Sequence, residues 1–197
     1  MKTIYAIILA AGESVRMGTP KMLLQFGGCT IIEKVLDNTR NSSINDYIVV
    51  VGAFNREIIS ASGEKESRFS YNDRYKSGML TSVQCGIMAI RGKCDGAMII
   101  LGDQPMTGTG VINKVADCYR NNRNGIIIPV YKGKRGHPVV IDKKYWNTID
   151  KLDPDKGLKS LMEIFQEDIL EADIDDQVIL RDIDTPEDYN REINYKL

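Results

Sequence analysis

The amino-acid sequence predicts an α/β fold in which βαβ units build a mostly parallel sheet. Short apolar runs bounded by Gly, Pro, Asn or Asp alternate with stretches whose apolar residues recur at helical spacing. Two of the runs, 7–9 and 98–101, are continuously apolar, which is typical of central parallel strands covered on both faces. We find no repeat, low-complexity tract or linker in the 197 residues, so we expect a single domain over 1–197.

The expected strands follow the apolar runs in chain order. They are Ile4–Leu9, Tyr47–Val51, Arg68–Tyr71, Gly96–Leu101, Gly125–Val130 and His137–Ile141, with weaker candidates at Ile169–Ala172 and Gln177–Asp182. The pieces from Val130 to Ile141 and around Leu180 depart from strict strand–helix alternation. We interpret them as a small antiparallel extension of the parallel sheet.

The stretches between these strands predict helices. They are Ile31–Arg40, Glu57–Ser62, Leu80–Arg91, Thr109–Asn121, Lys143–Ile149, Leu158–Phe165 and Pro186–Tyr195. The last of them has a good start signal, because Thr185 suits the N-cap position and Pro186 the first helical position.

Composition excludes several classes of function. Lys and Arg total 26 and Asp and Glu 27, so the net charge of −1 offers no general attraction for nucleic acid. The four cysteines form no C-x-x-C pair, which favours a reduced, cytoplasmic protein without structural zinc. The apolar run 4–11 is too short to span a bilayer, and a buried first strand explains it better than a signal peptide. We therefore expect neither a nucleic-acid nor a membrane partner.

The strongest candidate site is the segment 9–21, LAAGESVRMGTPK, directly after the first strand. Small residues there let backbone N–H groups approach a phosphate closely, and Arg16 and Lys21 supply positive charge. A plain glycine-bearing turn with two solvated cations is the alternative interpretation. We expect Lys21 itself to be solvated, as lysines normally are. The candidate nucleotide-binding residues of this segment are Leu9, Ala10, Ala11, Gly12 and Lys21.

A second candidate is Gly102-Asp103-Gln104-Pro105, which follows the strand Gly96–Leu101. In open α/β sheets the ligand crevice lies beyond the carboxyl ends of the strands, so Asp103 is expected beside segment 9–21. A carboxylate there can hold Mg²⁺ against phosphate oxygens, because Mg²⁺ takes only one or two protein carboxylates. Alternatively, Asp103 is a turn residue ahead of the helix that begins near Thr109.

These motifs resemble the molybdopterin nucleotidyltransferases, which join a nucleoside triphosphate to a phosphorylated acceptor. L-A-A-G-x-S-x-R-M-G-x-P-K is similar to the family's signature loop, and G-D-Q-P to its metal site. The resemblance extends in order over residues 4–21, 73–86, 98–105, 130–140 and 182–189. It implies a Rossmann-like, doubly wound fold of the nucleotide-diphospho-sugar transferase type.

The resemblance also implies roles for single residues. Arg16, Lys21 and Asp103 would be catalytic, and Asp103 would hold Mg²⁺ or Mn²⁺. Asp184, in a D-I-D-T-P-x-D segment similar to the family's last motif, is a candidate second metal ligand. The alternative is that Asp184 belongs only to the start of the final helix, where acidic residues are favourable.

Two further segments match the family more loosely. Gly78 and Ser82, at the start of the helix Leu80–Arg91, are similar to residues that line the nucleotide-base pocket, with Asp73 or Asn72 shortly before them. His137, the single histidine, stands in a Gly-His-Pro element that the resemblance places toward the acceptor. Helix-start and structural-histidine interpretations remain open for these two segments.

The resemblance thus implies transfer of a nucleotide from CTP to the phosphate of molybdopterin or of the molybdenum cofactor, with release of pyrophosphate. Ala10-Ala11-Gly12 favours CTP, because guanylyl-transferring relatives usually carry Ala-Gly-Gly there. The alternatives are GTP or another triphosphate, an acceptor such as methylerythritol phosphate or a sugar phosphate, and a nucleotide-binding domain without catalysis. A molybdoenzyme that receives the product is a further candidate partner.

Overall fold

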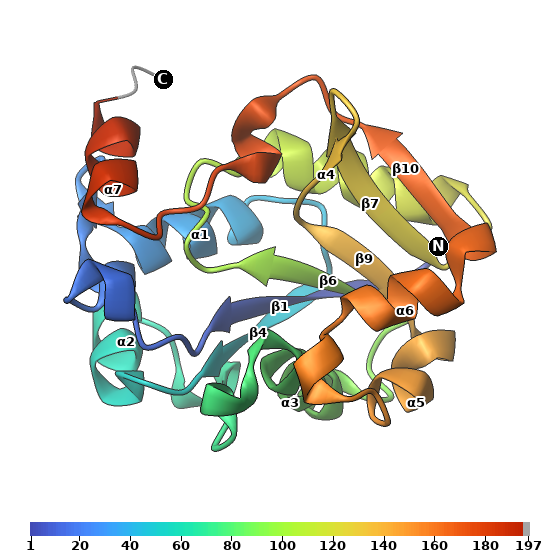
Figure 1. Ribbon diagram of the computed structural model, residues 1–197, viewed down its shortest axis with the longest axis horizontal. Helices are drawn as coiled ribbons and strands as arrows, with labels where there is room; N and C mark the ends of the chain where they lie inside the picture. The colour runs from blue at the N-terminus through green and yellow to red at the C-terminus, as the bar shows by residue number, and fades with distance from the viewer. Residues whose placement is uncertain (195–197) are drawn as a thin grey trace.

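The computed structural model describes residues 1–194 and shows a central sheet between helices (Figure 1). The strands are β1 Ile4–Ala10, β2 Gln25–Phe26, β3 Cys29–Thr30, β4 Asp46–Val51, β5 Phe69–Tyr71, β6 Gly96–Leu101, β7 Ile126–Tyr131, β8 Lys134–Arg135, β9 Val139–Asp142 and β10 Ile169–Asp173. The helices are α1 Ile31–Arg40, α2 Asn55–Ser62, α3 Met79–Ile90, α4 Thr109–Asn121, α5 Trp146–Ile149, α6 Lys159–Ile164 and α7 Pro186–Ile193.

The sheet is mostly parallel, as predicted. Its strand order is β10-β7-β9-β6-β1-β4-β5, and β8 pairs with β7 outside this path. β9 runs antiparallel to both of its neighbours, β6 and β7, and β8 runs antiparallel to β7. The antiparallel part therefore lies inside the sheet and does not extend one edge.

The predicted strand Gln177–Asp182 is wrong. Residues Gln177–Leu180 form a 3₁₀ helix instead. The carboxylate of Asp176 accepts a hydrogen bond from the backbone N–H of Val178, which starts a helical turn and competes with strand pairing. Val178 and Ile179 are buried against the sheet, so the apolar run that suggested a strand reflects burial.

The predicted helices are present, two of them with the expected bounds, α1 and α4. Thr30 and Glu33 form a capping box that fixes the start of α1. The predicted helix Lys143–Ile149 consists of a 3₁₀ turn, Lys143–Tyr145, followed by the short α5. The last predicted helix ends at Ile193, and its expected end, Tyr195, lies outside the described residues.

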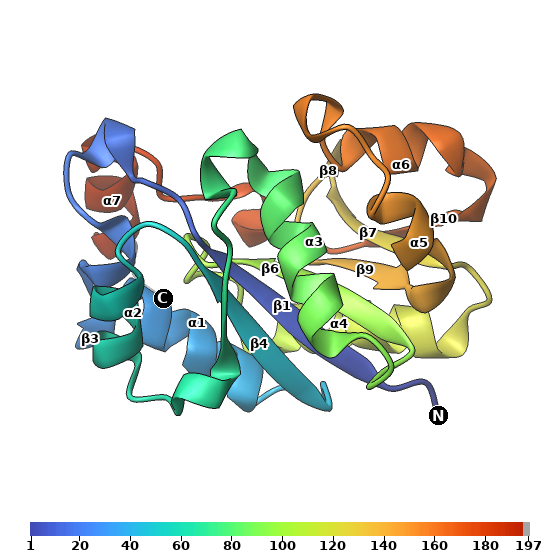
Figure 2. The ribbon, with the colours of Figure 1, turned by 90° about the horizontal axis from the view of Figure 1, so that it is seen from below.

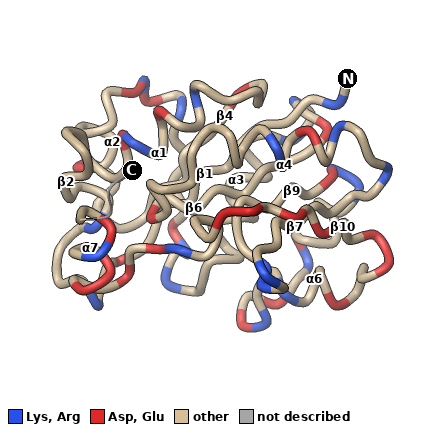
Figure 3. The backbone as a smooth tube through the Cα atoms, turned by 90° about the horizontal axis from the view of Figure 1, so that it is seen from above, with Lys and Arg blue, Asp and Glu red and all other residues tan. Residues whose placement is uncertain are grey.

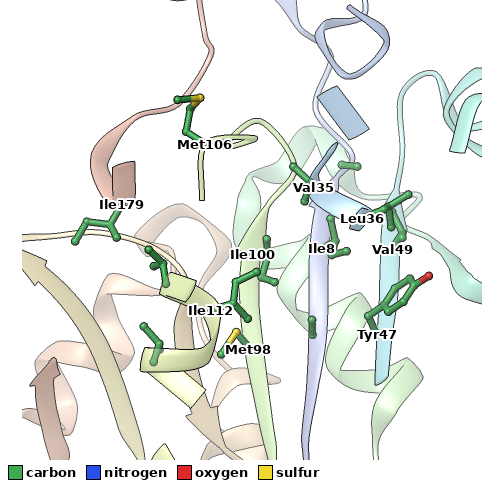
Figure 4. Close-up of a cluster of buried hydrophobic side chains, with 14 of the residues drawn as sticks. Ile8, Val35, Leu36, Tyr47, Val49, Met98, Ile100, Met106, Ile112 and Ile179 are labelled. Atoms are coloured by element: carbon green, nitrogen blue, oxygen red, sulfur yellow. The ribbon is translucent and has the colours of Figure 1, made fainter. Parts of the chain in front are cut away.

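Helices cover both faces of the sheet. Side chains of α1, α2 and α4 pack with one face of β1, β4 and β6 in one apolar cluster. Figure 4 shows part of this cluster, with Ile8, Ile100 and Val49 from the strands beside Val35 and Leu36 of α1. Helices α3, α5 and α6 pack on the opposite face, which is nearest the viewer in Figure 2. Both faces are therefore closed to water, in agreement with the continuously apolar strands.

Helix α3 approaches the sheet unusually closely at Gly86. A Cβ atom at this position would lie 2.3 Å from Cγ2 of Ile7 on β1. Glycine costs helix stability, but here it lets α3 lie directly against the central strand. This contact sets how closely α3 packs on β1, and so helps to position the amino-terminal end of α3 beside the carboxyl ends of the strands.

Charged residues of both signs occur along the backbone (Figure 3), and acidic residues predominate between Lys159 and Arg181. This distribution accords with the net charge of −1. In the part of the chain that the structure describes, no helix combines the length and the apolar character needed to cross a membrane.

Candidate active site

Two loops that follow central strands begin side by side at the carboxyl end of the sheet. β1 pairs in parallel with β6, and their last paired residues are Leu9 and Leu101. The N–H of Gly102 donates to the carbonyl of Leu9 at 3.0 Å, and a Cβ atom at Gly102 would lie 2.7 Å from that carbonyl. Glycine is therefore needed where the two loops separate. The strand order reverses at this point, which is where open α/β sheets bind ligands.

The centre of the site is a lysine held between two carboxylates. Nζ of Lys21 lies 2.6 Å from Oδ2 of Asp103 and 2.8 Å from Oδ1 of Asp184. These three residues come from positions far apart in the chain, after β1, after β6 and before α7. The expectation that Lys21 is solvated is wrong, since its residue exposure is 8%. Two neighbouring carboxylates compensate the burial of the ammonium group.

The pKa values of this group follow from burial and charge. Burial alone would lower the pKa of Lys21, but the charges and hydrogen bonds of Asp103 and Asp184 outweigh it and raise that pKa. Burial raises the pKa of Asp103, and the ammonium group of Lys21 opposes this shift. The ammonium group of Lys21 therefore favours the ionised form of Asp103, which burial disfavours.

The loop that carries Arg16 and Lys21 is closed by its own hydrogen bonds. Ser14 has a left-handed backbone, with φ 53°, and its Oγ accepts from the N–H of Lys21 at 3.2 Å. The guanidinium of Arg16 lies 2.8 Å from Oδ2 of Asp184, and its side chain is 71% exposed. Lys21 is thus a fixed charge of the site, whereas Arg16 lies at its rim and is accessible to a ligand.

Asp103 and Asp184 fit a divalent cation. Oδ1 of Asp103 is buried and has no hydrogen-bond partner, so one carboxylate oxygen remains available as a ligand. Carboxylate oxygens are the hard ligands that Mg²⁺ and Mn²⁺ prefer. Within residues 1–194 no cluster of three or more His, Cys, Asp or Glu side chains could hold a metal ion. A cation here would therefore have to complete its coordination with substrate oxygens and water.

Asp184 does not serve as the cap of the final helix. Thr185 is the N-cap of α7, and Asp188 completes a capping box with it. The carboxylate of Asp184 points instead to Lys21 and Arg16. Thr185 and Asp188 therefore form the helix start, and the carboxylate of Asp184 belongs to the group around Lys21.

A cleft of about 470 Å³ surrounds this group and contains most of the predicted nucleotide-binding residues. Its lining is Leu9, Ala11, Gly12, Glu13, Arg16, Lys21, Met22, Tyr75, Lys76, Gly78, Met79, Ser82, Leu101, Asp103, Asp182 and Asp184. The structure does not bring Ala10 or Asp73 into it. Ala10 is fully buried in the core, and Asp73 lines a separate pocket with Tyr71 and Gln84.

Asn72, the other residue considered at this position, contacts the start of α3. Its amide nitrogen donates to Oγ1 of Thr81 at 2.9 Å and to Oγ of Ser82 at 3.0 Å. Its side-chain oxygen accepts from the N–H of Arg74. Asn72 is 3% exposed and therefore acts from behind the cleft wall. It links the segment after β5 to the helix that carries Ser82.

Sequence reasoning missed several residues of the cleft. Tyr75 and Lys76 belong to a 3₁₀ turn just before Gly78, and Lys76 lies 3.6 Å from Glu13 across the opening. No motif marks these positions. Their nearness to Gly78 was the single available signal.

His137 lies in a second pocket, also of about 470 Å³, which shares Met79 with the first. Its lining is Met79, Ile128, Arg135, Gly136, His137, Val139, Gly157, Leu158, Lys159 and Met162. Burial lowers the pKa of His137 to about 4, so the imidazole is neutral at neutral pH. The second pocket therefore has apolar walls, a neutral imidazole and two cationic side chains.

This fold, with a buried lysine between two carboxylates at its topological switch point, is the arrangement expected of an α/β nucleotidyltransferase. The MobA-like NTP transferase domain family matches residues 6–172, and the chain belongs to this family. The chain is accordingly an enzyme of the nucleotidyltransferase class.

Two curated proteins are similar to this chain in sequence. The molybdenum cofactor cytidylyltransferase of Escherichia coli K12 is 26% identical over 190 residues, which cover 96% of this chain and 95% of the relative. The nicotine blue oxidoreductase of Paenarthrobacter nicotinovorans is 28% identical over 144 residues, 69% of each chain.

Solved structures agree with the fold. The crystal structure of Rv0371c from Mycobacterium tuberculosis H37Rv has a TM-score of 0.88 and 24% identity, and covers 98% of this chain and 100% of that chain. A structure of the same protein in complex with manganese has a TM-score of 0.80 and 22% identity over the same shares.

Proposed function

We propose that this protein is a cytidylyltransferase that acts on the molybdenum cofactor. It would transfer CMP from CTP to the terminal phosphate of molybdopterin, or of its molybdenum-loaded form, and release pyrophosphate. The 26% identity to the E. coli enzyme over 96% of this chain supports this acceptor. The Ala10-Ala11-Gly12 sequence of the first loop supports CTP over GTP. A molybdoenzyme that takes up the product is the protein partner we propose.

The observation that carries the proposal is the contact of Lys21 with both Asp103 and Asp184 at the switch point of the sheet. A triphosphate needs concentrated positive charge, and a divalent cation needs carboxylates beside it. The cleft contains the cations Arg16, Lys21 and Lys76 together with Asp103 and Asp184, and Asp103 retains an unpartnered oxygen. A domain that only bound a nucleotide would have no need of this pair of carboxylates.

The proposed reaction requires little covalent chemistry from the protein's own side chains. The attacking acceptor phosphate is already anionic, so no general base is needed. Arg16 and Lys21 would stabilise the negative charge that develops on the α-phosphate and on the leaving pyrophosphate. Mg²⁺ or Mn²⁺, held by Asp103 and Asp184, would add positive charge against the phosphate oxygens. Catalysis then depends on position and charge.

We assign the two pockets to the two substrates. The backbone of Leu9, Ala11 and Gly12 would contact the triphosphate, and Gly78 and Ser82 would line the base end of the cleft. Asp73, in the neighbouring pocket, would reach a nucleotide only if the 72–77 segment moved. His137 would bind the acceptor, with Arg135 and Lys159 of the same pocket beside it.

Pyrophosphate release tests the proposal. The purified chain is mixed with Mg²⁺ or Mn²⁺, with each of CTP, GTP, ATP and UTP, and with molybdopterin, methylerythritol phosphate or a sugar phosphate. We expect release with CTP and molybdopterin only. Release with GTP or with another acceptor would change the substrate assignment. No release with any pair of substrates would support a binding domain.

We also propose that residues 1–197 act as one domain in the cytoplasm, since the cysteines suit a reduced compartment.

A further inference from the structure

The segment that carries Asp184 is held from its other side by a buried ion pair. Nε of Arg181 donates to Oε1 of Glu192 at 3.0 Å, and its Nη2 donates to Oε2 of the same carboxylate. The side chain of Glu192 is 0% exposed and that of Arg181 11%. Arg191 adds a third contact, with its Nε 3.1 Å from Oε1 of Glu192. Such a two-point contact fixes the orientation of both groups.

The position of this pair in the fold is informative. Arg181 stands three residues before Asp184, and Glu192 lies in the last turn of α7. Between them, the N–H of the fully buried Ile183 donates to the backbone carbonyl of Asp103 at 3.0 Å. In Figures 1 and 2, α7 lies beside the loop that follows β1. The segment 181–184 therefore joins α7 to the residues that form the centre of the site.

Stability alone does not account well for this arrangement. A buried ion pair usually contributes little net stability, because two charges must lose their water. What it does supply is a defined geometry at its own location. Here that location is one short segment away from a carboxylate that must meet Lys21 and Arg16 at 2.8 Å.

We infer that Glu192, acting through Arg181, is a positioning residue that fixes the carboxylate of Asp184 relative to Asp103 and Lys21. Its catalytic effect rests on the proposed function, whereas its effect on the 181–184 segment does not. Loss of Glu192 would allow Ile183 to separate from Asp103 and Asp184 to move. A misplacement of about 1 Å in a catalytic group can reduce a rate by about 10²-fold.

The test compares three variants. Glu192→Gln removes the negative charge of the Arg181–Glu192 ion pair, which we call the clamp. The double variant Arg181→Met/Glu192→Leu replaces the pair by apolar side chains of similar size, an exchange that proteins often tolerate without loss of stability. Tyr189→Phe is the matched control on the same helix, because it removes only the bond from Tyr189 Oη to the carbonyl of Gln25. Each variant is measured for amide hydrogen exchange at Ile183, for Tm, and for kcat and KM of pyrophosphate release with CTP.

We expect faster exchange at Ile183 and a kcat reduced by about 10²-fold in both clamp variants, with little change in the KM for CTP. Tyr189→Phe should change neither exchange at Ile183 nor kcat. Wild-type exchange at Ile183 and wild-type kcat in a folded double variant would overturn the inference, as would equal losses in Tyr189→Phe. If the wild-type chain itself releases no pyrophosphate, the proposed function fails, and the exchange rates still decide whether the clamp holds the segment.

Discussion

At the level of single residues, Lys21 shows which properties of the candidate site could be predicted from the sequence. Its place at the end of the loop after β1 was predictable from the motif, and the structure brings it to Asp103 as the rule on strand ends requires. Its burial was not predictable, because it depends on Asp184, 163 positions away. The roles of these residues remain predictions that mutation can test.

Lys21→Ala should cost both activity and stability. Removing one partner of a buried ion pair leaves an uncompensated carboxylate, which typically costs about 3–5 kcal/mol. We expect a lower Tm, together with loss of pyrophosphate release. Lys76→Ala is the control, since the side chain of Lys76 is 69% exposed at the edge of the same cleft. A Lys21→Ala protein with wild-type Tm would mean that Asp103 does not need this charge.

Asp103→Asn and Asp184→Asn test the two carboxylates. Loss of one preorganised electrostatic group commonly reduces kcat by about 10²–10³-fold. We expect a loss of this size for Asp103→Asn. For Asp184→Asn we expect a reduced kcat with a nearly unchanged Tm, because Thr185 and Asp188 retain the helix cap. A titration of kcat against Mn²⁺ and Mg²⁺ measures the loss of kcat in each variant, and thermal unfolding measures Tm. Near-normal kcat of Asp103→Asn at saturating metal would remove the metal site from the proposal.

His137 gives the protein a predictable response to acid. Burial lowers its pKa to about 4, so between pH 6.5 and pH 4 the unfolded chain binds a proton that the folded chain does not. The free energy of unfolding should therefore fall as the pH falls through this window. Tm measured from pH 7 to pH 4 should decline more steeply for the wild-type protein than for His137→Gln. Parallel curves would show that folding does not lower the pKa of His137.

At the scale of elements, predictions succeeded where the signal was local. The capping box of Thr30 and Glu33 lies within four residues, and α1 has the predicted bounds. Gln177–Asp182 failed because an apolar run can be buried without pairing, and a single carboxylate, that of Asp176, decided between strand and turn. The position of β9 inside the sheet depends on pairing with β6 and β7, which no local pattern encodes.

Gly86→Ala tests the packing of α3 on the sheet. A Cβ atom at 2.3 Å from Ile7 forces the helix away from β1, and such overpacking typically costs about 1–3 kcal/mol. We expect a lower Tm and a higher KM for CTP, because Gly78 and Ser82 lie at the other end of the same helix. Gly110→Ala in α4, where an added Cβ meets nothing within 4 Å, is the control. Equal Tm values for the two variants would contradict the close contact.

At the scale of the whole molecule, the fold class and the location of the site followed from the order of strands and helices. Parallel strands bring their carboxyl ends to one edge, so loops separated by about ninety residues of sequence could be expected to meet there. Outside segment 130–140, which carries the Gly-His-Pro element, the lining of the second pocket could not be predicted, nor could Tyr75 and Lys76 of the cleft. They arise from contacts between elements and leave no motif in the chain.

In the proposed reaction the α-phosphorus of CTP is transferred to a phosphorylated acceptor. The most direct measurement follows CTP labelled at the α-phosphate during reaction of the wild-type chain with molybdopterin and Mg²⁺ or Mn²⁺. We expect the label to appear in a cytidine dinucleotide product, with one unlabelled pyrophosphate released for each transfer. Label that remained in CTP, or that appeared in free CMP without an acceptor product, would contradict it.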